Sequence, residues 1–398
     1  MNIIHIEDFF HPDAGYQINI LSKYFVKQGH DVTIITSEMK KIPEFLTDFF
    51  GRNNIEQADK NYTNKTGVNI VRLPLKAFIS GRAVYQSNIF RKVNELKPDI
   101  LYVHSNDTLI AIRYLLRLKK LNYPLVMDCH MLEMASKNPF NKEFRMFYKM
   151  LITPIIKKNN IKVIRIEDDN YVEKCLGIPL TQCPWISVGS DTILFHPDND
   201  TRQSFRKQNN ISSDDFVVVY TGKLDTSKGG KLLAEAFKNK LINSKNKNVV
   251  LVVVGNASGE YGKEVDEIFN KSENVVLRFP TQKYIDLPQF YQAADLSVFP
   301  KQCSLSFYDA QACGLPVVSE DNNINIDRLQ YNNGYNFRSG NIEDFRTKIT
   351  QCIDMDSYKL TKMGIDAYNF VKENYDYEDI AKQYTDILVD EYNKFHGR

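Results

Sequence analysis

Residues 299–319 carry several groups that could bind a phosphorylated ligand. The segment is typical of a strand end, a turn, a short helix with one acid and a Gly-Leu-Pro break before a second apolar run. A helix that begins near Ser304 would offer the backbone N–H groups of Cys303, Ser304 and Leu305 to a phosphate. Asp309 lies on the same helix and could accept two hydroxyl hydrogen bonds, as in the recognition of a ribose diol. From composition alone, a solvated acid on the helix surface is the simpler interpretation of Asp309.

Residues 221–230 form a second candidate phosphate site. The stretch follows an apolar run, opens a helix and contains Gly222, Lys223 and Lys228. A helix N-terminus provides unpaired N–H donors and partial positive charge, and each lysine adds a full charge, so the stretch suits a diphosphate. The spacing of a Walker A loop is missing. A solvated turn with incidental lysines is the alternative that composition alone favours.

Small residues and histidines follow the apolar runs of the first half of the chain. The turn 11–15 includes Ala14 and Gly15, which allow a ligand to approach the backbone closely. His104 and His130 come at or just after the ends of predicted strands, where an α/β sheet exposes reactive groups. Each feature has a structural alternative, because a turn is needed there in any case and a lone histidine is more often structural.

No metal site is expected from the sequence. The six cysteines are scattered without a Cys-x-x-Cys pair or a metal-ligand spacing, which favours reduced thiols in an intracellular protein. The acidic run Glu167-Asp168-Asp169 could be interpreted as a metal cluster, but acids are also favoured at a helix N-terminus or in a solvated loop. We therefore predict neither a metal nor another cofactor.

Composition and charge argue against some classes of function. The chain has 398 residues with 51 Lys and Arg against 49 Asp and Glu, and this near-neutral balance argues against bulk nucleic-acid binding. No stretch reaches the ~18 apolar residues of a membrane span, and the first residues lack a signal-peptide pattern. We expect a cytoplasmic protein whose membrane contact, if it has one, is peripheral at the inner face of the cell membrane.

The elements that must position these residues fall into two series of apolar runs with helical patterns between them. Such runs are typical of parallel strands that helices cover on both faces. A polar segment, 186–213, separates the two series, and residues 336–396 are mostly helical in pattern. The runs are 3–6, 32–36, 69–73, 100–103, 125–127 and 163–166, then 216–220, 249–254, 275–277, 296–299 and 317–318. The sequence therefore predicts an α/β protein of two Rossmann-like domains.

Taken in order, the motifs resemble those of the retaining glycosyltransferases of family 4, over nearly the whole chain. The matching segments are the turn at Ala14-Gly15, Gly29–Val32, Pro98–His104, Val188–Asp191, Gly222-Lys223 with Lys228-Gly229, and Asp309–Val318. The resemblance implies the GT-B fold, with two parallel sheets facing across a cleft. The implied acceptor-side domain spans 1–190 and the nucleotide-sugar donor domain spans 191–379, with helix 380–398 packing back on the first.

The resemblance also implies roles for the matching residues of the donor domain. Lys223 and Lys228, with Gly222 beside them, would hold the diphosphate of a nucleotide-sugar donor, and UDP is the expected nucleotide. Asp309 would bind the ribose of that nucleotide.

In the first domain the resemblance implies that His130 sits beside the transferred sugar and that the Ala14-Gly15 loop lies near the phosphates. An acceptor hydroxyl would attack the anomeric carbon from the face that the nucleotide leaves, so that configuration is retained without a metal. Catalysis would then consist of positioning and of charge stabilisation of the departing diphosphate.

The sequence departs from the family pattern where the donor would bind. Asp309 replaces the second Glu of the E-x7-E motif, and Lys301 stands where the first Glu is expected. A cation in that place reverses the local electrostatics. Three explanations remain open: Lys301 reads a different donor, such as an acidic or deoxy sugar; another residue takes over the role; or donor chemistry has been lost. We favour an active enzyme with altered donor recognition, since Lys223, Lys228 and Asp309 are all present.

Aromatic and basic residues occur together in the first half of the chain. They are Phe45, Phe49 and Phe50, the segment 140–150, and Lys157-Lys158. They could form a surface that rests on anionic membrane and receives a lipid-linked glycan. The buried face of an ordinary helix with solvated lysines explains segment 140–150 equally well.

The predicted function is that of a hexosyltransferase-type glycosyltransferase. It would move a sugar from a nucleotide-diphosphate donor to a hydroxyl of a glycan or lipid-linked glycan in the synthesis of cell-surface polysaccharide or glycoconjugate. One alternative is a GT-B sugar-nucleotide epimerase or phosphorylase. Another is a catalytically silent accessory or binding subunit, for which Lys301 is the best argument.

Overall fold

The computed structural model describes residues 1–397 except 44–53, 80, 131–139, 169 and 302–304. The chain divides into two compact units. Unit 1 comprises Met1–Val188 and Glu378–Arg398, and unit 2 comprises Gly189–Tyr377. The boundaries expected from the sequence are 190 and 380.

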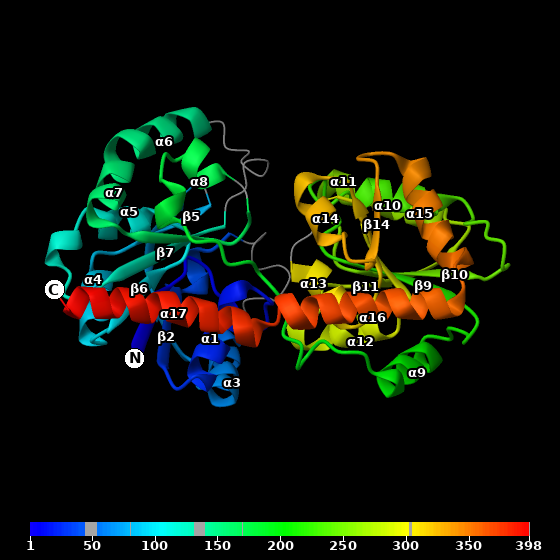
Figure 1. The fold of residues 1–398 in the computed structure, drawn as a ribbon, viewed down its shortest axis with the longest axis horizontal. Helices are drawn as coiled ribbons and strands as arrows, with labels where there is room; N and C mark the ends of the chain where they lie inside the picture. Colours follow the sequence, from blue (N-terminus) through cyan, green and yellow to red (C-terminus); the bar gives the residue numbers. More distant parts are fainter. Residues whose placement is uncertain (44–53, 80, 131–139, 169, 302–304, 398) are drawn as a thin grey trace. The chain divides into compact units, whose positions relative to one another are not determined.

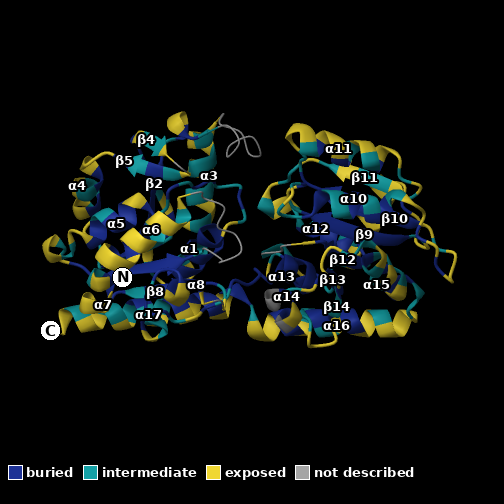
Figure 2. Cartoon of the chain, turned by 90° about the horizontal axis from the view of Figure 1, so that it is seen from above, coloured by how far each residue is buried: buried dark blue, intermediate teal, exposed yellow. Residues whose placement is uncertain are grey.

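Unit 1 contains a six-stranded sheet in the order β3-β2-β1-β6-β7-β8, in which all neighbours run parallel. The strands are β1 (Asn2–Ile6), β2 (Asp31–Ser37), β3 (Asn69–Leu73), β6 (Ile100–Val103), β7 (Leu125–Cys129) and β8 (Lys162–Arg165). A separate antiparallel hairpin joins β4 (Leu75–Ile79) and β5 (Arg82–Tyr85). β6 and β7 are buried throughout, including Asp128 of β7, and Figure 2 shows the interior of the unit largely in the dark blue of buried residues. Parallel strands end at one edge, so the segments after β1, β6 and β7 meet there.

The helices of unit 1 cover both faces of its sheet. Figure 1 shows α5 to α8 over one face and α1, α3 and α17 over the other. A π-helical turn, Tyr148–Ile152, joins α6 to α7. The bounds are α1 (Gln17–Lys27), α3 (Ile55–Thr66), α4 (Asn88–Glu95), α5 (Leu109–Leu115), α6 (Asn141–Phe147), α7 (Thr153–Asn159), α8 (Tyr171–Lys174) and α17 (Tyr377–His396).

The last helix, α17, packs on the first unit through buried polar and aromatic residues. The side-chain amide of Gln17 donates a hydrogen bond of 2.7 Å to the hydroxyl of Tyr384, and both residues are buried. The Tyr102 and Tyr384 rings stack, with centroids 6.3 Å apart. The end of the chain therefore returns to the core of unit 1.

Unit 2 contains a second six-stranded parallel sheet, in the order β11-β10-β9-β12-β13-β14. The strands are β9 (Phe216–Thr221), β10 (Val249–Val254), β11 (Val275–Phe279), β12 (Leu296–Phe299), β13 (Val317–Glu320) and β14 (Gly334–Phe337). β14 is missing from the sequence-based prediction, because its sequence GYNF is short and half polar. It forms by pairing with β13 at the edge of the sheet. The predicted α/β architecture, with one parallel sheet in each of two units, is confirmed.

The helices of unit 2 also lie on both faces of its sheet. α10 packs with α11 and α15, and α13 packs with α16, on opposite sides of the sheet (Figure 1). The bounds are α9 (Asn199–Gln208), α10 (Gly230–Lys238), α11 (Gly259–Asn270), α12 (Pro288–Gln292), α13 (Leu305–Ala312), α14 (Asn323–Arg328), α15 (Ile342–Asp354) and α16 (Ser357–Asn374). Among the helices that the structure describes, none has the length and apolar character needed to cross a membrane.

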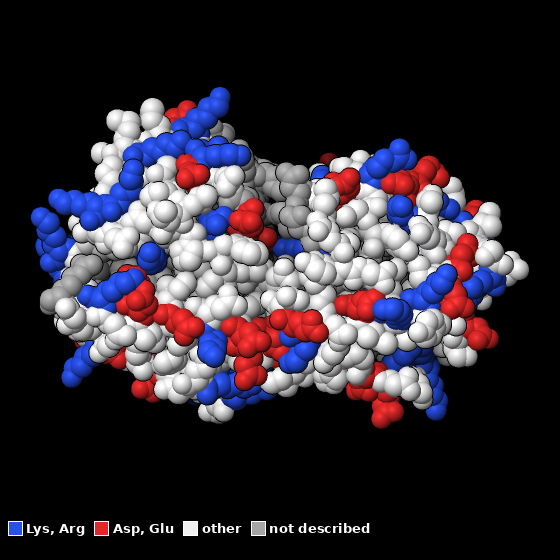
Figure 3. Space-filling model, viewed as in Figure 1, with Lys and Arg blue, Asp and Glu red and all other residues white. Residues whose placement is uncertain are grey.

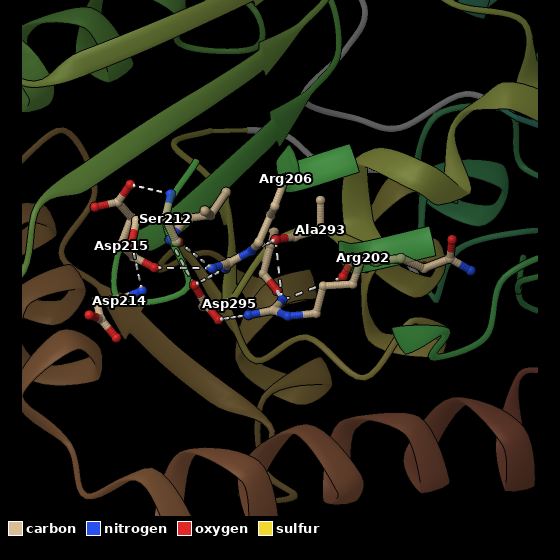
Figure 4. A network of polar contacts seen from close by, with 10 residues as sticks. Arg202, Arg206, Ser212, Asp214, Asp215, Ala293 and Asp295 are labelled. Atoms are coloured by element: carbon tan, nitrogen blue, oxygen red, sulfur yellow. Dashed lines mark hydrogen bonds and ion pairs between the residues drawn. The ribbon is translucent and has the colours of Figure 1, made fainter. Parts of the chain in front are cut away.

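Two arginines of α9 fix the start of the second sheet (Figure 4). Arg202 and Arg206 contact the two carboxylate oxygens of Asp295 at 2.5 and 2.7 Å. The same carboxylate accepts the backbone N–H of Val217, 2.7 Å away, and Arg206 also donates to the carbonyl of Ala293 at 2.9 Å. Because the charges are paired and hydrogen-bonded, this network is structural and leaves the other end of the strands for ligands.

Candidate functional site

The segment after β9 forms the first candidate site of unit 2. Gly222 follows the strand with φ +146°, and Gly255 follows β10 with φ +150°. A Cβ atom on Gly255 would lie 1.9 Å from the carbonyl oxygen of Gly222. The N–H of Leu224 donates to the carbonyl of Asn256 at 3.1 Å, which continues the pairing. Because only glycine tolerates so close an approach, these two residues hold the loops together at the carboxyl edge of the sheet.

Asp225 orders the loop that bears the two predicted phosphate lysines. Its carboxylate accepts hydrogen bonds from the Ser227 hydroxyl at 2.6 Å and from the Lys228 backbone N–H at 3.0 Å. Its carbonyl accepts the N–H of Gly230, the first residue of α10. Lys223 is exposed and Lys228 is half-buried. The loop therefore brings both lysines to the segment directly before the helix.

Lys301, the residue that departs from the family pattern, lies against the same loop. It comes two residues after β12, and its Nζ donates to the carbonyl of Thr226 at 3.2 Å. A Cβ atom on Gly229 would lie only 3.1 Å from Cβ of Lys301. Lys301 therefore adds a third cation to the loop of Lys223 and Lys228.

α13 places Asp309 in the interior of unit 2. Cys303 and Ser304, two of the predicted phosphate donors, lie outside the described residues, and the helix begins at Leu305. Asp309 is 2% exposed, so its interpretation as a solvated surface acid is wrong. The hydroxyl of Ser190 donates to Oδ1 of Asp309 at 2.7 Å. Burial raises the pKa of Asp309 well above its usual value, and the hydrogen bond from Ser190 opposes this shift.

In unit 1, the loop between β1 and α1 is compact. The N–H of Ala14 donates to the carbonyl of His11 at 3.1 Å, and the side-chain amide of Asn19 donates to the same carbonyl at 2.9 Å. Ala14 is buried and Gly15 is half-buried. This turn thus lies at the carboxyl end of β1, directly before α1.

The carboxyl ends of β1, β6 and β7 bring together ionisable side chains that we call the Asp128 cluster: His5, Glu7, His104, Asp128 and His130. Asp128 is fully buried at its centre. Its Oδ2 accepts hydrogen bonds from the Tyr102 hydroxyl at 2.8 Å and from Nδ1 of His104 at 2.7 Å. Its Oδ1 accepts the N–H of Ser105 at 2.7 Å. Burial alone would raise the pKa of Asp128, but His130 and His104 hold it well below its usual value.

The contact with Asp128 fixes one proton of His104. An ionised carboxylate only accepts, so His104 carries a proton on Nδ1. Its Nε2 lies 2.9 Å from Nδ1 of His5, and these two nitrogens share a hydrogen bond. Burial lowers the pKa of His5 well below its usual value, which keeps His5 neutral. His5 therefore adds no charge to balance Asp128.

His130 is the member of the cluster that reaches the surface. Its side chain is 32% exposed, and its Nε2 lies 3.2 Å from Oδ2 of Asp128. Burial disfavours the charged ring, but Asp128 and, at longer range, Glu7 outweigh it and raise the pKa of His130. Asp128 thus stabilises the charged form of His130.

The ligand atoms of His104, Asp128 and His130 lie within 4.8 Å of one another, as in some metal sites. Hydrogen bonds already account for this arrangement, because both ring nitrogens of His104 are used by His5 and Asp128. A metal would have to displace the proton on Nδ1 of His104. We therefore interpret the group as an ion pair with its supporting hydrogen bonds.

Sequence reasoning did not single out Glu7 or Asp128. Each is an acid that ends or interrupts a strand-like apolar run, which is a usable signal. The proximity of Glu7 to His130 depends on the strand order β1-β6-β7, which the apolar runs do not specify, whereas Asp128 lies two positions before His130 in the same segment.

Comparisons with known proteins assign both units. The sequence matches the family model "Glycosyltransferase Family 4" over residues 14–158, in unit 1, and "Glycosyl transferases group 1" over residues 201–370, in unit 2. A probable sucrose-phosphate synthase of Thermosipho melanesiensis is 24% identical over 417 aligned positions, which cover 96% of this chain and 92% of the relative.

Solved structures show the same fold. A glycosyltransferase from Rickettsia africae superimposes with a TM-score of 0.75 at 15% identity, covering 99% of this chain and 98% of the other. HepE from Anabaena, in complex with UDP-glucose, gives a TM-score of 0.73 at 18% identity, with coverages of 98% and 100%. The two family models, which between them match most of both units, show that the chain is a glycosyltransferase of family 4, and the shared fold is the GT-B fold.

Proposed function

We propose that this enzyme transfers a sugar from a UDP-sugar to a hydroxyl of a glycan acceptor, with retention of configuration and without a metal, in the synthesis of cell-surface polysaccharide or glycoconjugate. The observation that supports it best is the ordered loop 222–229, with Lys223, Lys228 and the adjoining Lys301 at the carboxyl edge of a parallel sheet. Three cations before a helix N-terminus suit a diphosphate. The UDP-glucose in the Anabaena structure supports the choice of nucleotide.

In the proposed reaction, the acceptor oxygen forms a bond to the anomeric carbon while the bond from that carbon to the diphosphate breaks. The proton of the acceptor hydroxyl passes to the departing diphosphate oxygen on the same face, so that configuration is retained. Negative charge grows on the diphosphate, and Lys223 and Lys228 stabilise it in the transition state. These cations supply the stabilisation that a metal ion provides in other transferases.

Two further residues would position the donor. The charged ring of His130, paired with Asp128, would donate a hydrogen bond to an oxygen of the transferred sugar. Asp309 would bind the ribose, with Ser190 fixing its carboxyl group. Gly15, in the Ala14-Gly15 turn, and the N-terminal residues of α13, including Leu305, would offer backbone N–H groups near the phosphates.

Ligand-dependent stabilisation tests this assignment. We expect UDP to raise the thermal midpoint of the wild type, and Lys228→Ala and Asp309→Ala to abolish most of the shift, because each removes a group that contacts the nucleotide. Lys240→Ala, which removes an exposed lysine of the same unit, is the matched control and should keep the shift. Release of UDP from a UDP-sugar only when an acceptor is added distinguishes a transferase from an epimerase. The absence of any UDP shift in the wild type would refute the proposal.

The same assay addresses donor choice. Lys301→Glu exchanges the third cation for an acid and should change the order of preference in a panel of neutral, acidic and deoxy UDP-sugars. An unchanged order and unchanged turnover would remove Lys301 from donor recognition.

We also propose that the acceptor is presented at an anionic membrane surface that unit 1 contacts. Phe140, Met146 and Met150 are 70%, 61% and 67% exposed, so segment 140–150 is not simply the buried face of a helix. Lys157 and Lys158 are also exposed. Phe45, Phe49 and Phe50 lie outside the described residues.

A further inference from the structure

A cationic cavity lies on the surface of unit 1, beside α6 and the π-helical turn. Its volume is about 450 Å³. It is lined by four cationic residues, Lys142, Arg145, Lys149 and Lys174, and by Met146 and Met150. Among the described residues, no acidic side chain lines it. The cavity is therefore a concentrated positive site next to apolar surface.

Two of the cations are held in place by the protein. Nζ of Lys149 donates to the carbonyl of Lys174 at 2.7 Å, at the end of α8. The guanidinium of Arg145 lies over the Tyr171 ring, 5.4 Å from its centroid. Nε of Arg145 is buried and has no hydrogen-bond partner among the described residues. Guanidinium and ammonium groups form charge-assisted hydrogen bonds to phosphate oxygens, which suits these side chains to an anionic ligand.

Exposed apolar side chains occur in the helical segment that lines the cavity. Besides Met146 and Met150, Phe147 and Leu151 are 41% and 57% exposed. Single exposed apolar residues are ordinary, whereas several within two helical turns mark an interaction site. Figure 3 shows Lys and Arg side chains gathered over α6 and α7, next to this surface. Apolar and cationic groups in this combination are the signature of a face that enters a membrane interface.

We propose that this cavity binds the phosphate headgroup of an anionic membrane lipid while Met146 and Met150 enter the acyl-chain boundary. Charge complementarity supports a lipid as the occupant, since four cations face a phosphodiester and the apolar rim matches the hydrocarbon behind it. This inference rests on the proposed contact of unit 1 with a membrane. It adds the residues that make the contact and the lipid phosphate that they bind. Unit 1 is then the part of the protein that binds the membrane.

Co-sedimentation of the full chain with vesicles tests the proposal. We expect binding to phosphatidylcholine vesicles that contain phosphatidylglycerol, no binding to phosphatidylcholine alone, and weaker binding at high salt. Each cation near an anionic surface contributes roughly fivefold to partitioning, so Lys142→Gln with Lys174→Gln should lower it about 25-fold. Met146→Ser with Met150→Ser should lower binding as well. All four side chains are exposed, so these variants keep the fold.

Lys119→Gln with Lys120→Gln is the matched control, because it removes the same charge from exposed positions of unit 1. Equal loss of binding in this control, or binding independent of phosphatidylglycerol, would overturn the proposal. So would a wild type that binds no vesicles but self-associates through Met146 and Met150, since the face would then be an interface between copies. The UDP-induced thermal shift should be unchanged in all variants, which separates failure here from failure of the donor site.

Discussion

At the scale of single residues, the charge of His130 depends on Asp128. In the wild type, Asp128 and Glu7 raise the pKa of His130 above 6.5 despite burial. In Asp128→Asn the partner charge is lost and burial remains, so we expect the pKa of His130 to fall to 6.5 or below. Titration of the His130 ring by NMR, assigned with His130→Gln, measures the change. An equal pKa in both proteins would mean that Asp128 does not set the charge of His130.

The same pair makes stability depend on pH in two directions. The folded pKa of His130 is raised, so its contribution is complete below 6.5 and is lost as the pH rises through the folded pKa. The folded pKa of Asp128 is depressed, so its contribution is complete above 3.8 and is lost as the pH falls through the folded pKa. Asp128→Asn should therefore destabilise unit 1 most between these limits, by about 3–5 kcal/mol, since it leaves buried donors unpaired.

At the scale of elements, the donor loop depends on contact between the segments after β9 and β10. Gly255→Ala would place a Cβ atom 1.9 Å from the Gly222 carbonyl oxygen, at a φ that alanine rarely adopts. We expect a loss of about 2–4 kcal/mol in urea unfolding and weaker UDP binding, because Gly222 and Lys223 must shift. Gly259→Ala is the control: its φ is also positive, at +66°, but its Cβ would meet open space. It should cost only about 1 kcal/mol and leave UDP binding intact, and an equal effect of both substitutions would contradict the steric argument.

At the scale of the whole molecule, each unit has its own parallel sheet and its own apolar core. We therefore expect calorimetry to show two unfolding transitions, and UDP to raise only the one that belongs to unit 2. At a UDP concentration 100 times its dissociation constant, the gain is about 2.7 kcal/mol, which corresponds to about 5–10 °C for a unit of this size. A single transition, or equal shifts of both transitions, would show that the units do not unfold separately.

The sequence by itself determined the architecture, because a parallel strand covered on both faces must be apolar along its length. The runs at Ile3–Ile6 and Val249–Val254 are therefore visible without a structure. It also predicted that Lys223 and Lys228 share a loop directly before a helix, since a glycine turn with lysines before a helix is a local pattern. The edge strand Gly334–Phe337 escaped detection, because its hydrogen bonds to β13, and not its own composition, make it a strand.

Tertiary structure alone decided which charges meet. Whether Asp309 is a surface acid or a buried group held by Ser190 depends on packing between residues that are 119 positions apart in the sequence. The contact of Lys301 with Thr226 and the hydrogen bond of His104 to Asp128 likewise arise where neighbouring strands of a parallel sheet end. Burial and charge pairing depend on where a side chain lies in the folded protein. The residue types therefore identified candidate site residues, but the strand order determined which of them are buried or paired.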